Sequence, residues 1–166
     1  MSSKDRSLLI LKYSLYSSGI LLLFSFLSPV LGIGMGLIQN LLFVVVGAEI
    51  ALCCAEYKKR TDEALNYKGA FLIGWQMSFV IGLINAFVVL LAIYLLGKEN
   101  FTAEIAKYKS IFMSQGITDE STIDESIKII ANPWFLFCVT IVFYSGIGFF
   151  LSTIIAFFAK TATTNK

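Results

Sequence analysis

The chain contains no histidine, only two prolines and three cysteines, and few charged side chains. Charged residues make up 14% of its 166 residues, whereas a soluble domain carries about 25%. Without histidine, the usual zinc spacings and a Cys-His nucleophile are excluded, and no CxxC pair is present. We therefore expect no metal and no cofactor, and we interpret the cysteines as small apolar filler. They are Cys53, Cys54 and Cys138.

Other absences remove further classes of function. No basic patch with interleaved aromatic residues is present, so no nucleic acid is expected as a partner. The segment 33–36, IGMG, is too apolar and too poor in glycine to bind phosphate. No predicted span holds a second carboxylate at bilayer depth beside Glu49, and no serine occurs in a nucleophile-elbow context. An enzyme is therefore the class that the sequence favours least.

What the chain has in abundance is apolar residues, at 57%, with a mean hydropathy of +0.80. About 20 predominantly apolar residues are needed to cross a bilayer as a helix. Four stretches of this kind predict an all-α fold: a single integral membrane domain, residues 1–166, built as a polytopic helical bundle. We expect Pro29 to end the first span and Pro133 to open the fourth. The expected spans are 8–27, 37–57, 69–96 and 133–158.

Basic residues predict the orientation of these spans. They gather before the first span, between the second and third, and after the fourth, whereas segment 97–132 holds four lysines against six acids. By the positive-inside rule, both termini are expected in the cytoplasm and segment 97–132 outside it. The alternative, a cleaved signal peptide at the N-terminus, lacks an A-x-A-like site. The loop after the second span provides the cytoplasmic basic anchor, Lys58, Lys59, Arg60 and Lys68.

Two short amphipathic helices are expected in segment 97–132. Phe101, Ile105, Tyr108 and Phe112 recur at helical spacing, and Ile123, Ile127 and Ile130 repeat the pattern after Gly116. Thr118, Asp119 and Ser121 offer N-cap oxygens, and Ser121 and Asp124 have the separation of a capping box. A partly ordered connector is the alternative. Because the segment is net acidic, we expect it to contact the protein's own spans or a partner rather than anionic lipid.

Small residues indicate where the spans approach one another. One row lies on the second span and another on the third, and Gly148 and Ser152 form a shorter row on the fourth. Ordinary packing between helices is sufficient to explain such rows. The two longer rows are Gly47, Ala51 and Ala55, and Gly74, Ser78 and Gly82.

Glu49 is the ionisable residue that we predict near the middle of the bilayer. An intramembrane charge costs from about 2.5 kcal/mol upward, so we expect this carboxyl to be protonated and to face the interior of the bundle. Its expected hydrogen-bond donors are Gln76 and Asn85, and Ser14, Ser17 and Ser18 of the first span. A proton or cation coupling site and a structural hydrogen bond are both open, and the structural interpretation is favoured because no second acid accompanies Glu49.

Several short motifs resemble one family. They are EYKKR at 56–60, YKGAFLIGW at 67–75, SQGITDE at 114–120, ANPWF at 131–135 and IIAFFAK at 154–160. In these the chain resembles the uncharacterised four-span membrane proteins, mostly from Bacteroidota, of the domain of unknown function 4199 family. The resemblance implies a multi-pass protein of the bacterial inner membrane and no established activity. The chain has Arg60-Thr61-Asp62 where the family usually has Arg-Asp, and Glu49 matches no family motif.

Two functions therefore remain as hypotheses. The first is a small accessory or scaffold subunit that contacts a larger membrane or envelope-biogenesis protein. The second is a small proton-coupled transporter, working as a homo-oligomer, that uses Glu49. Four-span multidrug exporters with one membrane glutamate offer an analogy for the transporter, but they carry the acid in the first span and lack a long outer segment.

Overall fold

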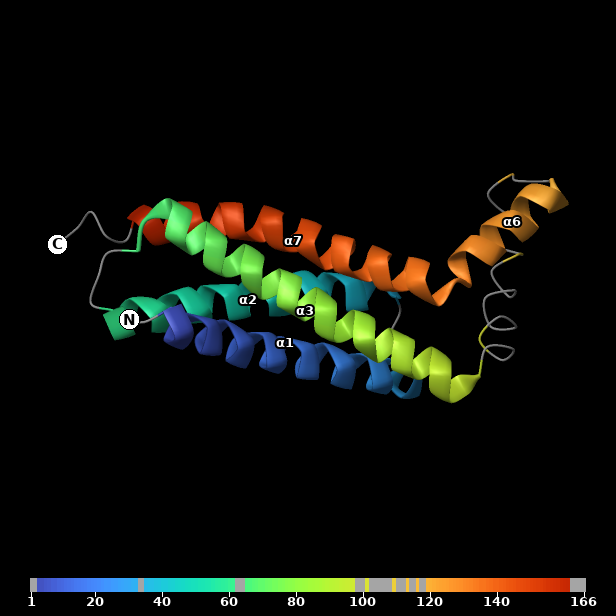
Figure 1. Ribbon diagram of the computed structural model, residues 1–166, viewed down its shortest axis with the longest axis horizontal. Helices are drawn as coiled ribbons and strands as arrows, with labels where there is room; N and C mark the ends of the chain where they lie inside the picture. Colours follow the sequence, from blue (N-terminus) through green and yellow to red (C-terminus); the bar gives the residue numbers. More distant parts are fainter. Residues whose placement is uncertain are drawn as a thin grey trace. The chain divides into compact units, whose positions relative to one another are not determined.

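The computed structural model describes residues 3–32, 35–61, 65–97 and 119–161, together with Phe101, Lys109, Met113 and Gly116. Throughout these residues the regular structure is helical and no strand occurs, which confirms the all-α prediction (Figure 1). The helices are α1 (Ser3–Leu31), α2 (Met35–Thr61), α3 (Tyr67–Leu96), α6 (Glu120–Ile130) and α7 (Pro133–Thr161).

Four of these helices are long and apolar enough to cross a membrane, as the sequence predicted. Only 22% to 33% of the residues in each apolar stretch are buried within the protein. A water-soluble monomer rarely exposes apolar patches of more than a few hundred Å². The exposed apolar surface of these helices therefore requires apolar surroundings, and the chain is a membrane protein. The apolar stretches are Lys4–Leu27, Asn40–Thr61, Tyr67–Leu95 and Pro133–Ala159.

The end of α1 differs from the prediction. The helix does not stop at Pro29 but continues to Leu31, and Gly32 follows with a φ of +64°. A proline removes one backbone donor, which a helix tolerates near its end. The left-handed conformation that terminates a helix is adopted most readily by glycine, so Gly32 rather than Pro29 marks the end.

The starts of α3 and α7 follow from capping side chains. The Asn66 side-chain oxygen accepts a hydrogen bond from the N–H of Gly69 at 2.7 Å, so α3 begins at Tyr67, before the predicted Gly69. Pro133 opens α7 as predicted, and the Asn132 side-chain oxygen accepts from the N–H of Trp134 at 3.0 Å. Both asparagines satisfy backbone donors that have no partner within a first helical turn.

The chain forms two compact units, and α3 and α7 each contribute to both. Unit 1 comprises residues 1–84 and 142–166, and unit 2 comprises residues 85–141. In unit 1, α1 and α3 begin at the end of the bundle where α2 and α7 finish (Figure 1). The basic residues that flank these helices therefore gather at one end of unit 1.

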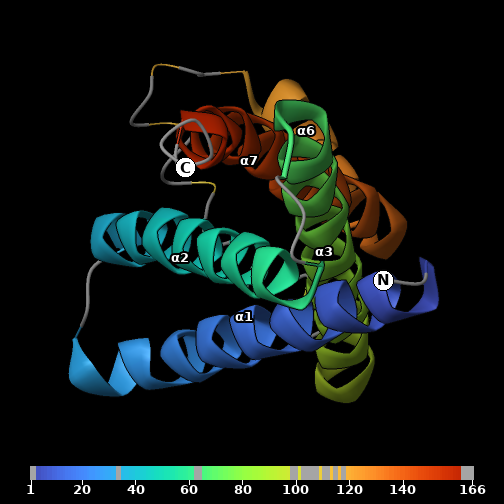
Figure 2. The same ribbon diagram turned by 90° about the vertical axis from the view of Figure 1, so that its left-hand side faces the viewer.

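Unit 1 is built around a single apolar core. Helix α1 packs beside α2 (Figure 2), and all four long helices supply buried side chains. The largest fully buried apolar side chains come from α2 and α3, and they are Val46, Ile50, Cys53, Ile73, Met77 and Ile81.

Unit 2 contains α6, whose apolar face is covered by the chain itself. Ile123 and Ile127 are buried, and Phe101 packs against them. Asp119 is the N-cap of α6, while Ser121 lies inside the first turn, so the predicted capping box of Ser121 and Asp124 is wrong. Of the first expected amphipathic helix, Phe101, Lys109 and Met113 are helical, and the other positions lie outside the described residues.

Candidate functional site

Glu49 lies on α2 and is half-buried. Its Oε2 atom is buried and has no hydrogen-bond partner within the described residues. The expected donor Gln76 is exposed on α3, and its Oε1 accepts a hydrogen bond from an Arg6 terminal nitrogen at 3.1 Å. The structure therefore gives Gln76 a partner on α1 and leaves one oxygen of Glu49 unsatisfied.

The other side chains that were expected to donate to Glu49 are all buried, but they differ in their hydrogen bonding. Ser14 donates to the backbone oxygen of Met77 at 3.1 Å, which links α1 to α3. The Ser17 hydroxyl is fully buried and, within the described part of the chain, makes no hydrogen bond. Ser18 is also buried, and Asn85 is a buried residue of unit 2.

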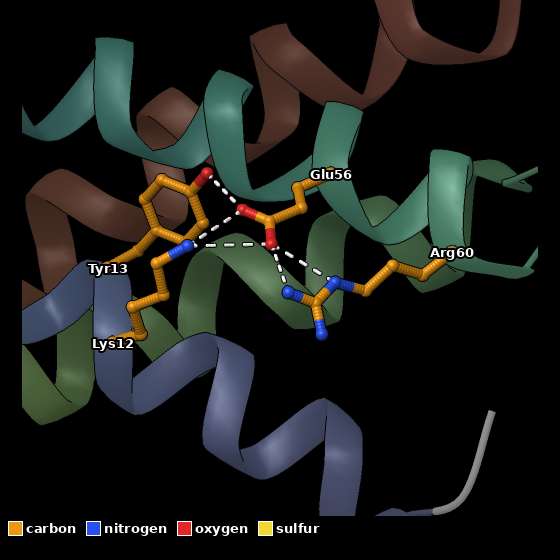
Figure 3. A network of polar contacts seen from close by, with 4 residues as sticks. All are labelled: Lys12, Tyr13, Glu56 and Arg60. Carbon is orange, nitrogen blue, oxygen red and sulfur yellow. Dashed lines mark hydrogen bonds and ion pairs between the residues drawn. The ribbon is translucent and has the colours of Figure 1, made fainter.

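A polar cluster that the sequence analysis missed surrounds Glu56 (Figure 3). The Lys12 ammonium lies 3.2 Å from Glu56 Oε2, and the Tyr13 hydroxyl donates to the same oxygen. Arg60 donates through Nε to Glu56 Oε1 at 3.0 Å and also through a terminal nitrogen. Two of the four side chains come from α1 and two from α2, so the cluster joins the two helices.

The Glu56 cluster is a paired structural group rather than a free reactive one. Two cations and a hydroxyl occupy both carboxylate oxygens, so Glu56 has little capacity left to accept a proton. The Lys12 ammonium also lies 5.1 Å from the ring centre of Tyr13 and 6.0 Å from that of Tyr16, within range of a cation–π interaction. The spacing of Glu56 and Arg60 by four residues was the signal in the sequence, but the partners on α1 were not predictable from it.

The small residues predicted on α3 and α7 meet in two reciprocal contacts. A Cβ built on Gly148 would lie 2.0 Å from the Ser78 Cβ, and one on Gly74 would lie 2.3 Å from the Ser152 hydroxyl oxygen. Real Cβ atoms do not approach other atoms this closely, so each contact requires a glycine. The structure thus brings the row on α3 against the row on α7, and Gly82 of the same row is buried.

In the predicted row of small residues on α2, only the first of the three positions contacts a neighbouring helix closely. The Cβ position of Gly47 lies in ordinary contact with Leu151, 3.8 Å away. Ala51 and Ala55 are exposed and line a groove of about 260 Å³, together with Ile155 of α7. Only Gly47 of this row therefore faces a close helical neighbour, because the two alanines lie toward the edge of the α2–α7 contact.

The basic anchor is mostly exposed. Lys59, Arg60 and Lys68 are exposed, and Lys58 is half-buried and lines the same groove as Ala55. Lys58, Lys59 and Arg60 lie in the last turn of α2, where positive charge complements the helix dipole. Within the described ranges, no three acidic or cysteine side chains come together in a way that could hold a metal ion.

The exposed side of α6 in unit 2 is acidic. Lys109 lies 3.6 Å from Glu120 and 3.5 Å from Asp124, and all three side chains are at least partly exposed. At the N-cap, hydrogen bonds from Thr122 and Ser121 lower the pKa of Asp119 below its ordinary value. Asp119 is therefore held as the anion that the start of a helix favours.

Comparison with known proteins identifies the family without adding an activity. Neither the curated proteins nor the solved structures contain a match to the chain. One family model, described as protein of unknown function (DUF4199), matches residues 12–161. That range contains all of α2, α3, α6 and α7 and most of α1. The chain belongs to the DUF4199 family of proteins of unknown function, as its sequence motifs indicated.

Proposed function

We propose that this protein is a small accessory or scaffold subunit of the bacterial inner membrane, and not an enzyme. In this proposal both termini are cytoplasmic, and segment 97–132 contacts a larger membrane or envelope-biogenesis protein outside. The observation that carries the proposal is the packing of α6. Its apolar residues Ile123 and Ile127 are covered by Phe101, while Glu120 and Glu125 remain exposed.

This packing distinguishes α6 from a helix that binds a membrane surface. Such a helix buries its apolar face among lipids and carries basic residues on its polar face. In α6 the apolar residues Ile123 and Ile127 are already covered by protein, and the exposed face carries three acids against Lys128 and the neighbouring Lys109. A protein partner with a basic surface fits this face better than an anionic bilayer.

Copurification from native membranes tests the accessory role. We expect a partner in stoichiometric amount with the wild-type chain, and at least tenfold less of it with the double variant Glu120→Lys/Glu125→Lys. Lys128→Glu is the matched control, because it reverses a charge on the same helix but makes the face more acidic. Full recovery with the double variant would exclude α6 as the contact, and a chain isolated only as a homo-oligomer would exclude the accessory role.

The orientation is tested with single cysteines in a cysteine-free background. A membrane-impermeant maleimide applied to intact cells with a permeabilised outer envelope is expected to label Glu125→Cys. Lys59→Cys should react only after the inner membrane is opened. Both positions are exposed, so a difference in labelling reports sidedness and not burial. The reverse pattern would invert the proposed topology.

The alternative function, a proton-coupled transporter, is supported by one observation on Glu49. Its buried Oε2 has no hydrogen-bond partner in the part of the chain that the structure describes, which a purely structural hydrogen bond does not explain. Glu49→Gln separates the two functions, because an amide can form hydrogen bonds but cannot release a proton. Wild-type partner recovery and cellular function in Glu49→Gln favour the accessory role, whereas loss of function in a folded variant favours transport.

A further inference from the structure

A groove in unit 1, between α1 and α3, combines apolar walls with a cation at its edge. Its volume is about 550 Å³, within the range of roughly 300 to 1,000 Å³ that is typical of small-molecule sites. Leu11, Trp75 and Phe79 are among its apolar residues, and Ser7 and Gln76 add polar atoms. The groove therefore suits a ligand that is largely apolar and polar at one end.

Arg6 supplies the cation. One terminal nitrogen of its guanidinium donates to Gln76 Oε1, which itself lines the groove. Gln76 is neutral, so this hydrogen bond fixes the position of the guanidinium without cancelling its charge. The Arg6 Nε donor is buried and has no hydrogen-bond partner among the described residues. This guanidinium is therefore not fully paired within the described part of the protein.

The exposure of the groove and the charges near one end of it indicate which kind of ligand it binds. Trp75 and Phe79 are 42% and 43% exposed within spans that lie against apolar surroundings, so the groove opens to the membrane. Lys4, in the same first turns of α1 as Arg6 and Ser7, adds a second positive charge at this end. Asp5 adds one negative charge in the first turn of the same helix.

We propose that this groove binds one anionic phospholipid, with an acyl chain against Leu11 and Trp75 and the phosphate on Arg6. A planar guanidinium recognises phosphate through two parallel hydrogen bonds, which a neutral site cannot offer. A second copy of the chain fits less well, because the facing groove would carry the same positive charges. The inference does not depend on the accessory role, since it concerns a different unit and a different ligand.

Fluorescence of Trp75 tests the proposal directly. The chain has two tryptophans, so Trp134→Phe leaves Trp75 as the single reporter. The full-length protein is reconstituted into vesicles of ordinary phosphatidylcholine. In one series an increasing fraction of brominated phosphatidylglycerol is added, and in the other an increasing fraction of brominated phosphatidylcholine. The bromine atoms on the acyl chains quench tryptophan on contact. We expect brominated phosphatidylglycerol to bind at Trp75 about fivefold more tightly than brominated phosphatidylcholine, the effect of roughly one basic residue.

Variants assign the preference to Arg6. Arg6→Gln should make the two brominated lipids equivalent. Gln76→Glu should do the same with Arg6 still present, because the new carboxylate neutralises the guanidinium and retains the link between α1 and α3. Lys59→Gln is the control: it removes an exposed positive charge from α2 and should leave the fivefold preference intact.

Three results would overturn the proposal. Equal quenching of the wild-type reporter by both lipids would show a groove that accepts any acyl chain. An absence of quenching would show that protein, such as a second copy, covers Trp75. An equal loss of preference in Lys59→Gln would show general attraction between a basic surface and anionic lipid, without a site at Arg6.

Discussion

The Tyr13 hydroxyl of α1 donates a hydrogen bond to the Glu56 carboxylate of α2, which fixes the alignment of these two antiparallel helices. Ser17 lies one turn farther along α1, and Glu49 lies two turns earlier on α2, so both are deeper in the span. The paired polar groups therefore lie near one end of the α1–α2 contact. Two buried polar atoms that have no partner among the described residues, Ser17 Oγ and Glu49 Oε2, lie farther from that end.

The link between Tyr13 and Glu56 predicts non-additive effects on stability. Tyr13→Phe and Glu56→Gln should each lower the midpoint of unfolding in detergent, because each removes part of the contact between α1 and α2. The double variant should be less destabilised than the sum of the two single variants. Tyr16→Phe is the control, since it keeps the aromatic ring near Lys12 and changes no hydrogen bond to Glu56. Strict additivity would contradict the pairing.

The close contact between Gly148 and Ser78 predicts a sharp difference between two glycines of α7. Gly148→Ala should destabilise the protein by about 1 to 3 kcal/mol, the usual cost of overpacking. Gly146→Ala should be neutral or stabilising, because nothing lies within 4 Å of its Cβ position and alanine is the better helix former. Thermal unfolding in detergent micelles measures both.

A compensating change tests the same contact from the other side. Ser78→Gly removes the side-chain atoms that the new methyl group would meet, and the Ser78 Cα lies at an acceptable 3.5 Å from it. The double variant Ser78→Gly/Gly148→Ala should therefore be more stable than Gly148→Ala alone. If it is no more stable, the loss in Gly148→Ala does not arise from this contact.

The four spans and their small-residue contacts could be predicted because they depend on patterns within single helices. Apolar length locates a span, and glycine and serine spaced four apart mark the face of closest approach, as Gly74 and Ser78 show. The predicted stop at Pro29 was wrong for a local reason: a proline near the end of a helix costs one hydrogen bond, while Gly32 supplies the conformation that ends it.

The polar contacts between helices could not be predicted, because they depend on the register and rotation of two spans. Lys12 and Glu56 are 44 residues apart, and no periodicity relates them. The hydrophobic effect does not orient spans in lipid as it orients helices in water, so apolar pattern alone does not reveal which polar residues meet. Gln76 illustrates the consequence, since it pairs with Arg6 and not with Glu49 Oε2.

The N-cap of α6 predicts a response to pH. Hydrogen bonds from Thr122 and Ser121 hold the pKa of Asp119 below its ordinary value of 3.8. The cap is therefore fully effective above that value, and its contribution declines as the pH falls through the lowered pKa of the folded state. The protection of the Ser121 and Thr122 amides from hydrogen exchange, measured relative to their intrinsic exchange rates at each pH, should fall below about pH 4 in the wild type. Asp119→Asn retains a capping oxygen that does not titrate, so the step should disappear in that variant.

Glu49 and Glu56 lie two turns apart on α2 and are predicted to differ in charge at neutral pH. A carboxylate at Glu49 Oε2 would be buried without a partner, which favours the protonated form, whereas Lys12 and Arg60 stabilise Glu56 as an anion. Infrared spectra of the reconstituted protein should therefore show a protonated carboxyl band that Glu49→Gln removes and Glu56→Gln leaves unchanged. Loss of a carboxylate band in Glu49→Gln would instead show that Glu49 is ionised in the wild type. The transporter hypothesis requires a protonated Glu49 at rest, so this result would also contradict proton coupling.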